Sequence, residues 1–459
     1  MENTENTLLT QKHILICCEQ MPDVCSTLLN QLEYITINFC GLVIRDLDHV
    51  NNIDKCLNEI CDEDTIIYLC GQTSTTYEKL NNVNHKIRYA IWELSDYSYY
   101  KDKKSQLVTL GQIPINIYNV GVLFREYFVQ KFVQQKDYFS LIESEHKFQE
   151  LTESNKENNA LRSGIYLTHV KKVGDKVHFK LLRCSTNFRG PTDNFGATDH
   201  EIINQINELA NNFYTEKVEL NHVLAQIYRN TPHGGQNKNT EKKAAIKMHS
   251  DKTKDMPTNG LIVFCSFYKY DPNNGYNYRV CKNDNYDITV VGLTKEVSAL
   301  TEIQFKLKNP EQHPTLEQLF KITLYPNSVF IMSLEMNRLY THEIIPSQLP
   351  INRIPTRMGY VIRCSNVNAY HKDGQTYVAN ESNDELNDEL NDELNDEFNY
   401  VKLEEPTPEG IEKLKKLYKN ENATSNFINY DDMTDSISLN FSLNEGDYKE
   451  PLVELSMVE

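Results

Sequence analysis

The sequence lacks several features that mark common protein classes. It has no apolar run of membrane-spanning length, and its N-terminus has no basic-then-apolar leader. Its 11 cysteines are odd in number, none forms a Cys-x-x-Cys pair, and seven lie before position 71. This pattern is typical of reduced, buried thiols rather than a disulfide framework. We therefore expect a soluble protein of the cytoplasm or nucleus with no membrane partner.

Nucleotide-binding signatures and a global positive charge are also missing. No Gly-x-Gly-x-x-Gly or P-loop follows a predicted strand. The net charge is −18, but from Glu381 onward there are 22 acidic and 6 basic residues, which leaves 43 acidic against 41 basic in residues 1–380. The nearly neutral folded part has no global basic field for nucleic acid. A lysine cluster between Lys238 and Lys254 could supply phosphate contacts or be a solvated insert.

At 459 residues, the chain has room for two or three domains. Residues 1–135 alternate short apolar runs, such as 115–123, with helix-length stretches, which predicts a small α/β domain of unassigned role. Residues 136–162 are predicted to be a connecting helix and linker. Residues 376–459, which include four acidic tetrads at 383–398, are predicted to be an acidic, largely disordered tail.

Residues 163–375 are rich in short strand patterns. They open with a predicted hairpin around Gly174 and a predicted helix that Asp199 caps and that runs through Asn212. Later strands are predicted at 223–228, 261–267, 288–291, 303–307, 322–324, 328–334 and 358–364. Close spacing of short strands indicates a sandwich or barrel. We expect an α+β protein whose double-stranded β-helix, or jelly roll, follows the small α/β domain and precedes the acidic tail.

The segment Met-His-Ser-Asp carries the most informative chemistry. In an extended strand, residues i and i+2 project to one side, so His249 and Asp251 can face a single ion. A second histidine, His342, lies far downstream. Two histidines and one carboxylate, with open positions opposite, suit non-haem Fe(II) in oxygen-activating enzymes. The same spacing recurs at His371 and Asp373, but no histidine follows it, so the first copy is favoured.

Four segments occur in the order found in one enzyme family. They are Gln226-Ile-Tyr-Arg-Asn230, Met248-His-Ser-Asp-Lys252, Ser328 to Pro346 with its Arg-Leu-Tyr-Thr-His-Glu-Ile-Ile-Pro turn, and Arg357-Met-Gly-Tyr-Val-Ile-Arg363. From Glu219 to Ser365 the chain resembles the AlkB-like branch of the Fe(II)/2-oxoglutarate-dependent dioxygenases. The resemblance implies a jelly-roll enzyme that uses 2-oxoglutarate and O₂ to hydroxylate a C–H bond. It also implies that His249, Asp251 and His342 ligate the catalytic iron.

Two further roles in the resemblance concern the co-substrate. Tyr228 would hydrogen-bond a 2-oxoglutarate carboxylate, and Arg357 would form a two-pronged ion pair with the distal carboxylate. Arg363 would be a second contact, although six residues of strand set it about 20 Å from Arg357. Arg353, in a predicted loop, is a rival of Arg357 for the carboxylate. Gly359 stands where the family carries a polar residue.

The substrate stays open at this point. The resemblance implies oxidative demethylation of an N-methylated nucleic-acid base, with loss of formaldehyde. The nearly neutral folded part leaves two alternatives, hydroxylation of a protein side chain and a non-catalytic interaction protein with a vestigial site. The only tryptophan, Trp92, lies in the N-terminal domain, so tyrosine or phenylalanine would have to stack a flipped base.

Overall fold

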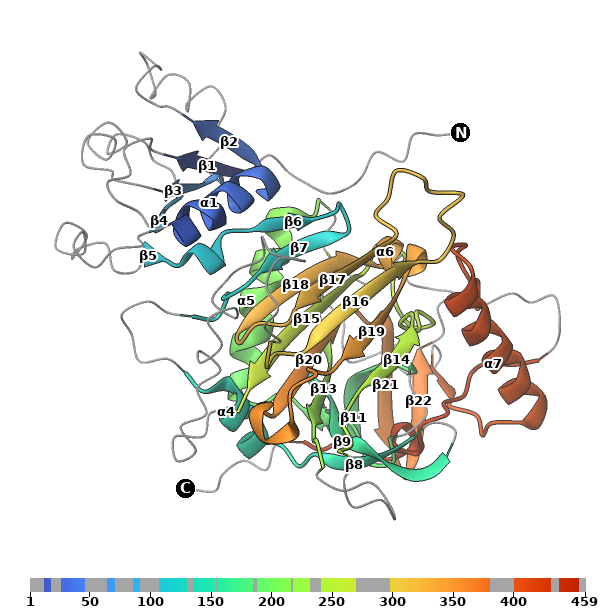
Figure 1. The fold of residues 1–459 in the computed structure, drawn as a ribbon. Helices are drawn as coiled ribbons and strands as arrows, with labels where there is room; N and C mark the ends of the chain where they lie inside the picture. Colours follow the sequence, from blue (N-terminus) through green and yellow to red (C-terminus); the bar gives the residue numbers. More distant parts are fainter. Residues whose placement is uncertain are drawn as a thin grey trace, which may run out of the picture.

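The chain is an α/β protein with mostly antiparallel sheets and few helices (Figure 1). The computed structural model describes residues 12–17, 26–45, 64–70, 86–90, 107–129, 136–153, 156–184, 188–215, 218–231, 241–269, 298–379, 400–430 and 437–453. The predicted strand 288–291, the acidic tetrads, Trp92 and Lys238 lie outside these residues. None of the described helices is long and apolar enough to cross a membrane.

A parallel sheet forms near the N-terminus, in the order β2-β1-β3-β4-β5. Its strands are β1 His13–Cys17, β2 Leu42–Arg45, β3 Ile66–Cys70, β4 Lys86–Ala90 and β5 Leu107–Val108, and helix α1 spans Ser26–Asn38. The apolar run predicted at 115–123 joins another sheet, as the antiparallel pair β6 (Ile115–Ile117) and β7 (Gly121–Phe124). Tyr118 and Asn119, at φ of 50° and 59°, form the kind of tight turn that favours such a hairpin.

A nine-stranded sheet is the largest layer, with the order β12-β9-β13-β20-β15-β18-β7-β6 and β8 paired to β9. Its remaining strands are β8 Gln149–Glu153, β9 Lys156–Thr168, β12 Asp193–Asn194, β13 His222–Tyr228, β15 Leu261–Tyr268, β18 Ser328–Ser333 and β20 Arg357–Arg363. The predictions for β13, β15, β18 and β20 are confirmed. These four strands are almost entirely buried, which explains why continuous apolar runs revealed them.

Two helices cover one face of this sheet, α4 (Tyr138–Glu145) and α5 (Ala197–Phe213). The apolar stripe predicted for α5 is buried as expected. The predicted cap is wrong, because Gly196 is the N-cap and Asp199 lies at N3, where Oδ2 accepts the Gly196 N–H at 2.8 Å. The connecting helix predicted for 136–162 ends at Glu145 and is followed by β8 and β9, whose pairing overrides the local helical pattern.

A four-stranded antiparallel sheet packs against the other face of the nine-stranded sheet. Its order is β14-β19-β16-β17, with β14 Ile246–His249, β19 Tyr340–Ile345, β16 Glu302–Leu307 and β17 Leu319–Thr323. Phe264 and Phe330 of the large sheet meet Phe305 of the small one in a single buried cluster. Helix α6 (Leu334–Leu339) carries the chain from β18 to β19 and so from one sheet to the other.

A third antiparallel sheet has the order β10-β11-β21-β22-β23. Its strands are β10 Lys171–Val173, β11 Lys176–Leu181, β21 Val367–Lys372, β22 Gln375–Ala379 and β23 Tyr400–Lys402. The hairpin predicted around Gly174 is confirmed by the pairing of Val173 with Lys176. The expectation of a disordered tail is wrong for its described residues, since they include β22, β23, helix α7 (Pro408–Ala423) and a 3₁₀ turn at Glu445–Tyr448. Leu414, Tyr430, Leu439 and Phe441 form a small core of their own there.

Candidate metal centre

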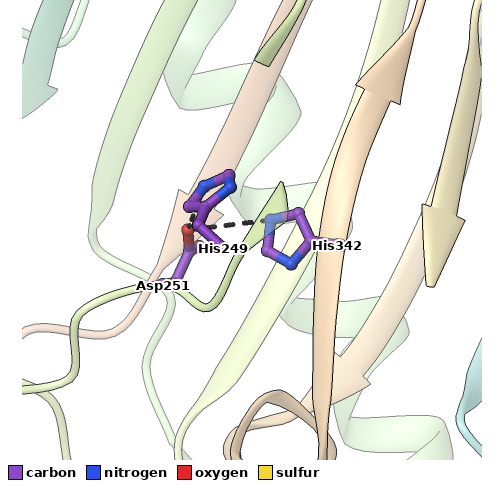
Figure 2. Close-up of side chains that lie close together, drawn as sticks. All are labelled: His249, Asp251 and His342. Carbon is purple, nitrogen blue, oxygen red and sulfur yellow. Dashed lines mark ion pairs between the residues drawn. The ribbon is translucent and has the colours of Figure 1, made fainter. Parts of the chain in front are cut away.

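Two strands of the four-stranded sheet bring the predicted ligands together. His249, the last residue of β14, lies opposite His342 of β19 in the strand register, and Asp251 follows β14 by two residues. Asp251 Oδ1 is 3.7 Å from His249 Nε2 and 3.9 Å from His342 Nε2 (Figure 2). One ligand atom from each residue lies within 4.8 Å of the other two. The separations of 3.7 and 3.9 Å are within reach of one transition-metal ion, because two atoms bound at about 2.1 Å are at most about 4.2 Å apart.

The hydrogen bond at His249 fixes which ring nitrogen is available. Its Nδ1 lies 2.8 Å from the carbonyl oxygen of Lys247. Because a carbonyl only accepts hydrogen bonds, Nδ1 carries the proton and Nε2 keeps its lone pair toward Asp251. Burial lowers the pKa of His249. Burial, together with the nearby ring of His249, also lowers the pKa of His342, to about 3. Both imidazoles are therefore neutral at neutral pH, which is the metal-binding form.

Asp251 divides its two carboxylate oxygens between different partners. Oδ2 accepts hydrogen bonds from Arg363 Nε at 3.0 Å and Nη2 at 2.8 Å, whereas Oδ1 faces the two imidazoles. Burial by itself would raise the pKa of Asp251, but Arg363 and both histidines hold it well below its ordinary value. The carboxylate is therefore charged. Arg363, which the resemblance implies to contact the co-substrate, forms a buried ion pair with a candidate ligand and also lines the cavity.

The three residues line a cavity of about 790 Å³ between the two sheets. Arg357 and Tyr228 also line it, from neighbouring positions of β20 and β13. The Arg357 guanidinium stacks over the Tyr228 ring, with its central carbon 4.1 Å from the ring centroid. Arg357 is 4% exposed, yet its Nε and Nη2 have no hydrogen-bond partner. Its Nη1 donates a long hydrogen bond, of 3.5 Å, to Ser266 Oγ. A buried guanidinium with two unpartnered nitrogens is costly unless it binds an anion, and its planar shape matches a carboxylate.

Glycine at position 359 keeps space open beside this guanidinium. A Cβ placed there would lie 3.1 Å from Arg357 Nη1 and 3.3 Å from Tyr228 Cε2. A polar side chain at this position would therefore occupy the space that an anion bound to Arg357 needs. The departure from the family pattern noted in the sequence is compatible with anion binding, and the donor set as a whole fits a metal ion together with a small carboxylate.

Other candidates from the sequence take no part in the cavity. Arg353 lies exposed in a 3₁₀ turn and does not line it. His371 is buried in β21, with Nδ1 3.0 Å from Thr376 Oγ1, and Asp373 lies in the turn after β21.

Sequence reasoning missed contributors from two helices. Asn337 of α6 accepts the Asp251 N–H and donates to the Asp251 carbonyl oxygen, both at 3.0 Å. Tyr418 and Asn422 of α7 line the cavity. Asn337 lies within the segment that resembles the family, so its position five residues before His342 was visible in the sequence. No sequence signal points to Tyr418 or Asn422, because α7 lies in the segment that the composition marks as a tail.

A second group with suitable side chains, Glu145, His146 and Asp199, also lies within ligand distance. Here His146 Nδ1 is 2.9 Å from Asp193 and Nε2 is 2.6 Å from Asp199. Asp199 in turn accepts a hydrogen bond from the Tyr360 hydroxyl at 2.7 Å. Because both ring nitrogens already bond carboxylates, this group is a hydrogen-bond network rather than a candidate metal centre.

Comparisons with known proteins add little to this geometry. No protein-family model matches the chain, and no curated protein matches it. A solved structure described as "The structure of OsALKBH1" is similar at 12% sequence identity and a TM-score of 0.29, with 53% of this chain and 96% of that chain covered. A TM-score this low carries no argument about function, so the assignment depends on the site itself.

Proposed function

We propose that the chain is an Fe(II)- and 2-oxoglutarate-dependent dioxygenase of the AlkB-like type, in which the nine- and four-stranded sheets form a double-stranded β-helix. One observation carries the proposal. The buried guanidinium of Arg357, with Nε and Nη2 unpartnered, lines the same cavity as His249, Asp251 and His342, whose ligand atoms lie close together. A metal site alone would not require that cation, and a carboxylate site alone would not require the three ligands.

The residues of the chain have separate tasks in this reaction. His249 and His342 would hold iron through their neutral imidazoles and Asp251 through its carboxylate, while Arg357 would bind the distal carboxylate of 2-oxoglutarate. When bound, the iron would supply O₂ activation coupled to oxidative decarboxylation of 2-oxoglutarate to succinate and CO₂. The apolar cavity wall, which includes Phe264, would exclude water from the oxidising site.

An N-methylated nucleic-acid base is the proposed substrate. Its methyl group would become a hydroxymethyl group, which leaves as formaldehyde. The charge of the cavity supports an anionic substrate, since its one acidic residue, Asp251, is outnumbered by cations. These cations are Arg162, Lys243, Lys247, Lys252, Arg357 and Arg363. Arg357 and Arg363 would be engaged by the co-substrate and Asp251. Three of the other four come from the lysine cluster noted in the sequence, and two of these, Lys243 and Lys252, already donate hydrogen bonds to carbonyl oxygens. Arg162 and Lys247 could therefore contact phosphates.

The first test is succinate release by anaerobically iron-loaded protein, without added substrate. We expect slow uncoupled turnover by the wild type and none by His249→Ala. The matched control is His371→Gln, which changes the second His-x-Asp copy and should leave turnover unchanged. Normal succinate formation by His249→Ala would contradict the proposal. A wild type that neither retains iron nor turns over would support the non-catalytic interaction protein instead.

The second test concerns the substrate. The active protein is offered an N-methylated single-stranded oligonucleotide or peptides, and formaldehyde release is measured together with substrate-stimulated succinate formation, which also reports side-chain hydroxylation. We expect release only from the oligonucleotide, with binding that weakens steeply as salt is raised, because phosphate contacts release counterions. Turnover of a peptide alone would favour the protein hydroxylase.

A further inference from the structure

Helix α7 approaches the segment that carries a candidate metal ligand. Residues 250–255, which contain Asp251, follow β14, and the C-terminal turns of α7 lie beside them, although about 170 positions of sequence separate the contacting residues. In Figure 1, α7 flanks the β-sheets on the side opposite the parallel sheet. The chain thus returns to its candidate site after the last segment that resembles the oxygenase family.

Side chains of α7 accept hydrogen bonds from the backbone on both sides of Asp251. The N–H of Ser250 donates to Asn422 Oδ1 at 2.7 Å. The N–H and hydroxyl of Thr253 donate to Glu421 Oε1 at 3.1 and 2.6 Å. Ser250 is only 1% exposed, so its N–H would lose its partner if Asn422 were absent, at a cost of about 1–3 kcal/mol.

Two lysines hold the end of the helix in place. Lys252 Nζ donates to the Tyr418 carbonyl oxygen at 3.0 Å. Lys308 Nζ, just after β16, donates to the carbonyl oxygens of Glu421 at 2.5 Å and Thr424 at 3.2 Å. Carbonyls of the last helical turn lack partners within the helix, and cations there are favoured by the helix dipole. The C-terminal end of α7 is therefore attached both to the ligand segment and to the four-stranded sheet.

Asp251 itself is held from the opposite direction. Asn337 of α6 bonds its backbone N–H and carbonyl, and Arg363 of β20 bonds its side chain. Those contacts fix one residue, whereas the contacts from α7 fix positions 250 and 253. The direction in which Oδ1 points depends on the backbone on both sides, and outer contacts of this kind orient metal ligands.

We infer that α7 is a positioning element of the metal centre, and that Asn422 and Glu421 hold segment 250–255 in the conformation that directs Asp251 Oδ1 toward the two imidazoles. This inference rests on the metal centre proposed above. It assigns a role to the C-terminal region, whose helix is required for full metal affinity. Neither residue touches the metal ligands' side chains, so both act through the backbone.

The experiment measures Co²⁺ binding to the full-length protein from the absorption bands of the metal. We expect Asn422→Leu to weaken Co²⁺ affinity about 10-fold, the usual size of such outer contacts. Asn422→Asp keeps an oxygen acceptor for the Ser250 N–H and should retain nearly wild-type affinity. Asn422 is solvent-exposed, so neither change opens a core cavity. Lys415→Ala, on the exposed surface of the same helix, is the matched control.

Thermal unfolding of the metal-free variants separates positioning from general stability. We expect Asn422→Leu to melt only a few degrees below Asn422→Asp, as a loss of about 1–3 kcal/mol implies, while their Co²⁺ affinities differ about 10-fold. Equal Co²⁺ affinity of Asn422→Leu and the wild type would overturn the role of α7. If the leucine variant unfolds, Glu421→Gln and Glu421→Leu repeat the comparison at the Thr253 contact. A wild type that binds no Co²⁺ at all would overturn the metal centre itself, and with it this inference.

Discussion

At the scale of single residues, some polar atoms of the candidate site have protein partners and others have none. Asp251 gives Oδ2 to Arg363 and leaves Oδ1 to the histidines. His249 uses Nδ1 for the Lys247 carbonyl and leaves Nε2 free. Arg357 keeps two nitrogens unpartnered although it is buried. His342 Nδ1 is also buried without a hydrogen-bond partner, whereas its Nε2 faces Asp251. The other unpartnered atoms are the ones that a metal ion and a carboxylate would use.

Arg357 should control the affinity for 2-oxoglutarate. Arg357→Ala is expected to raise the KM for 2-oxoglutarate at least 10-fold, because hydrogen bonds to a charged group contribute about 1.5–3 kcal/mol each. Arg353→Ala, at the exposed rival position, should leave the KM unchanged. Succinate release over a range of 2-oxoglutarate concentrations measures both. A larger effect at Arg353 would reverse the assignment.

Arg363 should stabilise the metal-free protein more than the metal-bound one. Arg363→Met leaves the buried carboxylate of Asp251 without its cation, and loss of one partner of a buried pair costs about 3–5 kcal/mol. A bound divalent ion would replace part of that positive charge. We therefore expect the unfolding midpoint to fall strongly without Co²⁺ and less with it. An equal fall in both states would show that the ion does not contact Asp251.

At the scale of secondary-structure elements, the sequence revealed the strands and helices whose own pattern of apolar residues shows which faces are buried. β15 and β18 are continuous apolar runs because both faces are covered, and α5 shows its buried stripe directly. The site contacts of α7 cannot be seen this way, since Asn422 and Glu421 are ordinary polar residues until a segment about 170 positions away lies beside them. The prediction of a helix and linker failed at β8 for a related reason, because the pairing of β8 with β9 outweighs the local sequence preference.

His146 joins α4, α5 and β12 in a way that depends on pH. Burial alone lowers the pKa of His146, but hydrogen bonds to Asp193 and Asp199 outweigh it and raise the pKa from 6.5 to about 9. A raised pKa in the folded state means that the stabilisation is complete below pH 6.5 and is lost as the pH rises through about 9. This difference in pKa corresponds to a contribution to folding stability on the order of 3 kcal/mol.

The measurement is the free energy of unfolding in urea between about pH 6 and about pH 10. Wild type should lose stability across this window. His146→Gln should be less stable than wild type at the acidic end and should show a shallower decline, since glutamine cannot carry the charge. Parallel declines for the two proteins would show that His146 does not supply the pH dependence.

At the scale of the whole molecule, the parallel sheet shares one interior with the four- and nine-stranded sheets. Leu15, Ile35 and Phe39 belong to the same buried cluster as Phe264 and Phe330. The sequence assigned them to separate domains because its local patterns change near residue 135. Such a change shows the periodicity of each segment but not which sheet faces pack together. Composition could not show that the β6–β7 pair, inside the first predicted domain, extends the nine-stranded sheet.

This shared interior predicts one cooperative unfolding transition for the parallel sheet together with the four- and nine-stranded sheets. His13 of β1 stacks on Phe213 of α5 with ring centroids 4.3 Å apart, and the Cys40 N–H donates to the Pro114 carbonyl at 3.2 Å. Deleting residues 1–106 would expose Phe213 and Ile115, both fully buried, and each exposed large apolar side chain costs about 1.5–3 kcal/mol. Calorimetry of the full chain should therefore show these sheets melting together. The shortened chain should melt at a lower temperature and bind an apolar dye, whereas two resolved transitions and an unchanged midpoint after deletion would mean that the parallel sheet folds independently.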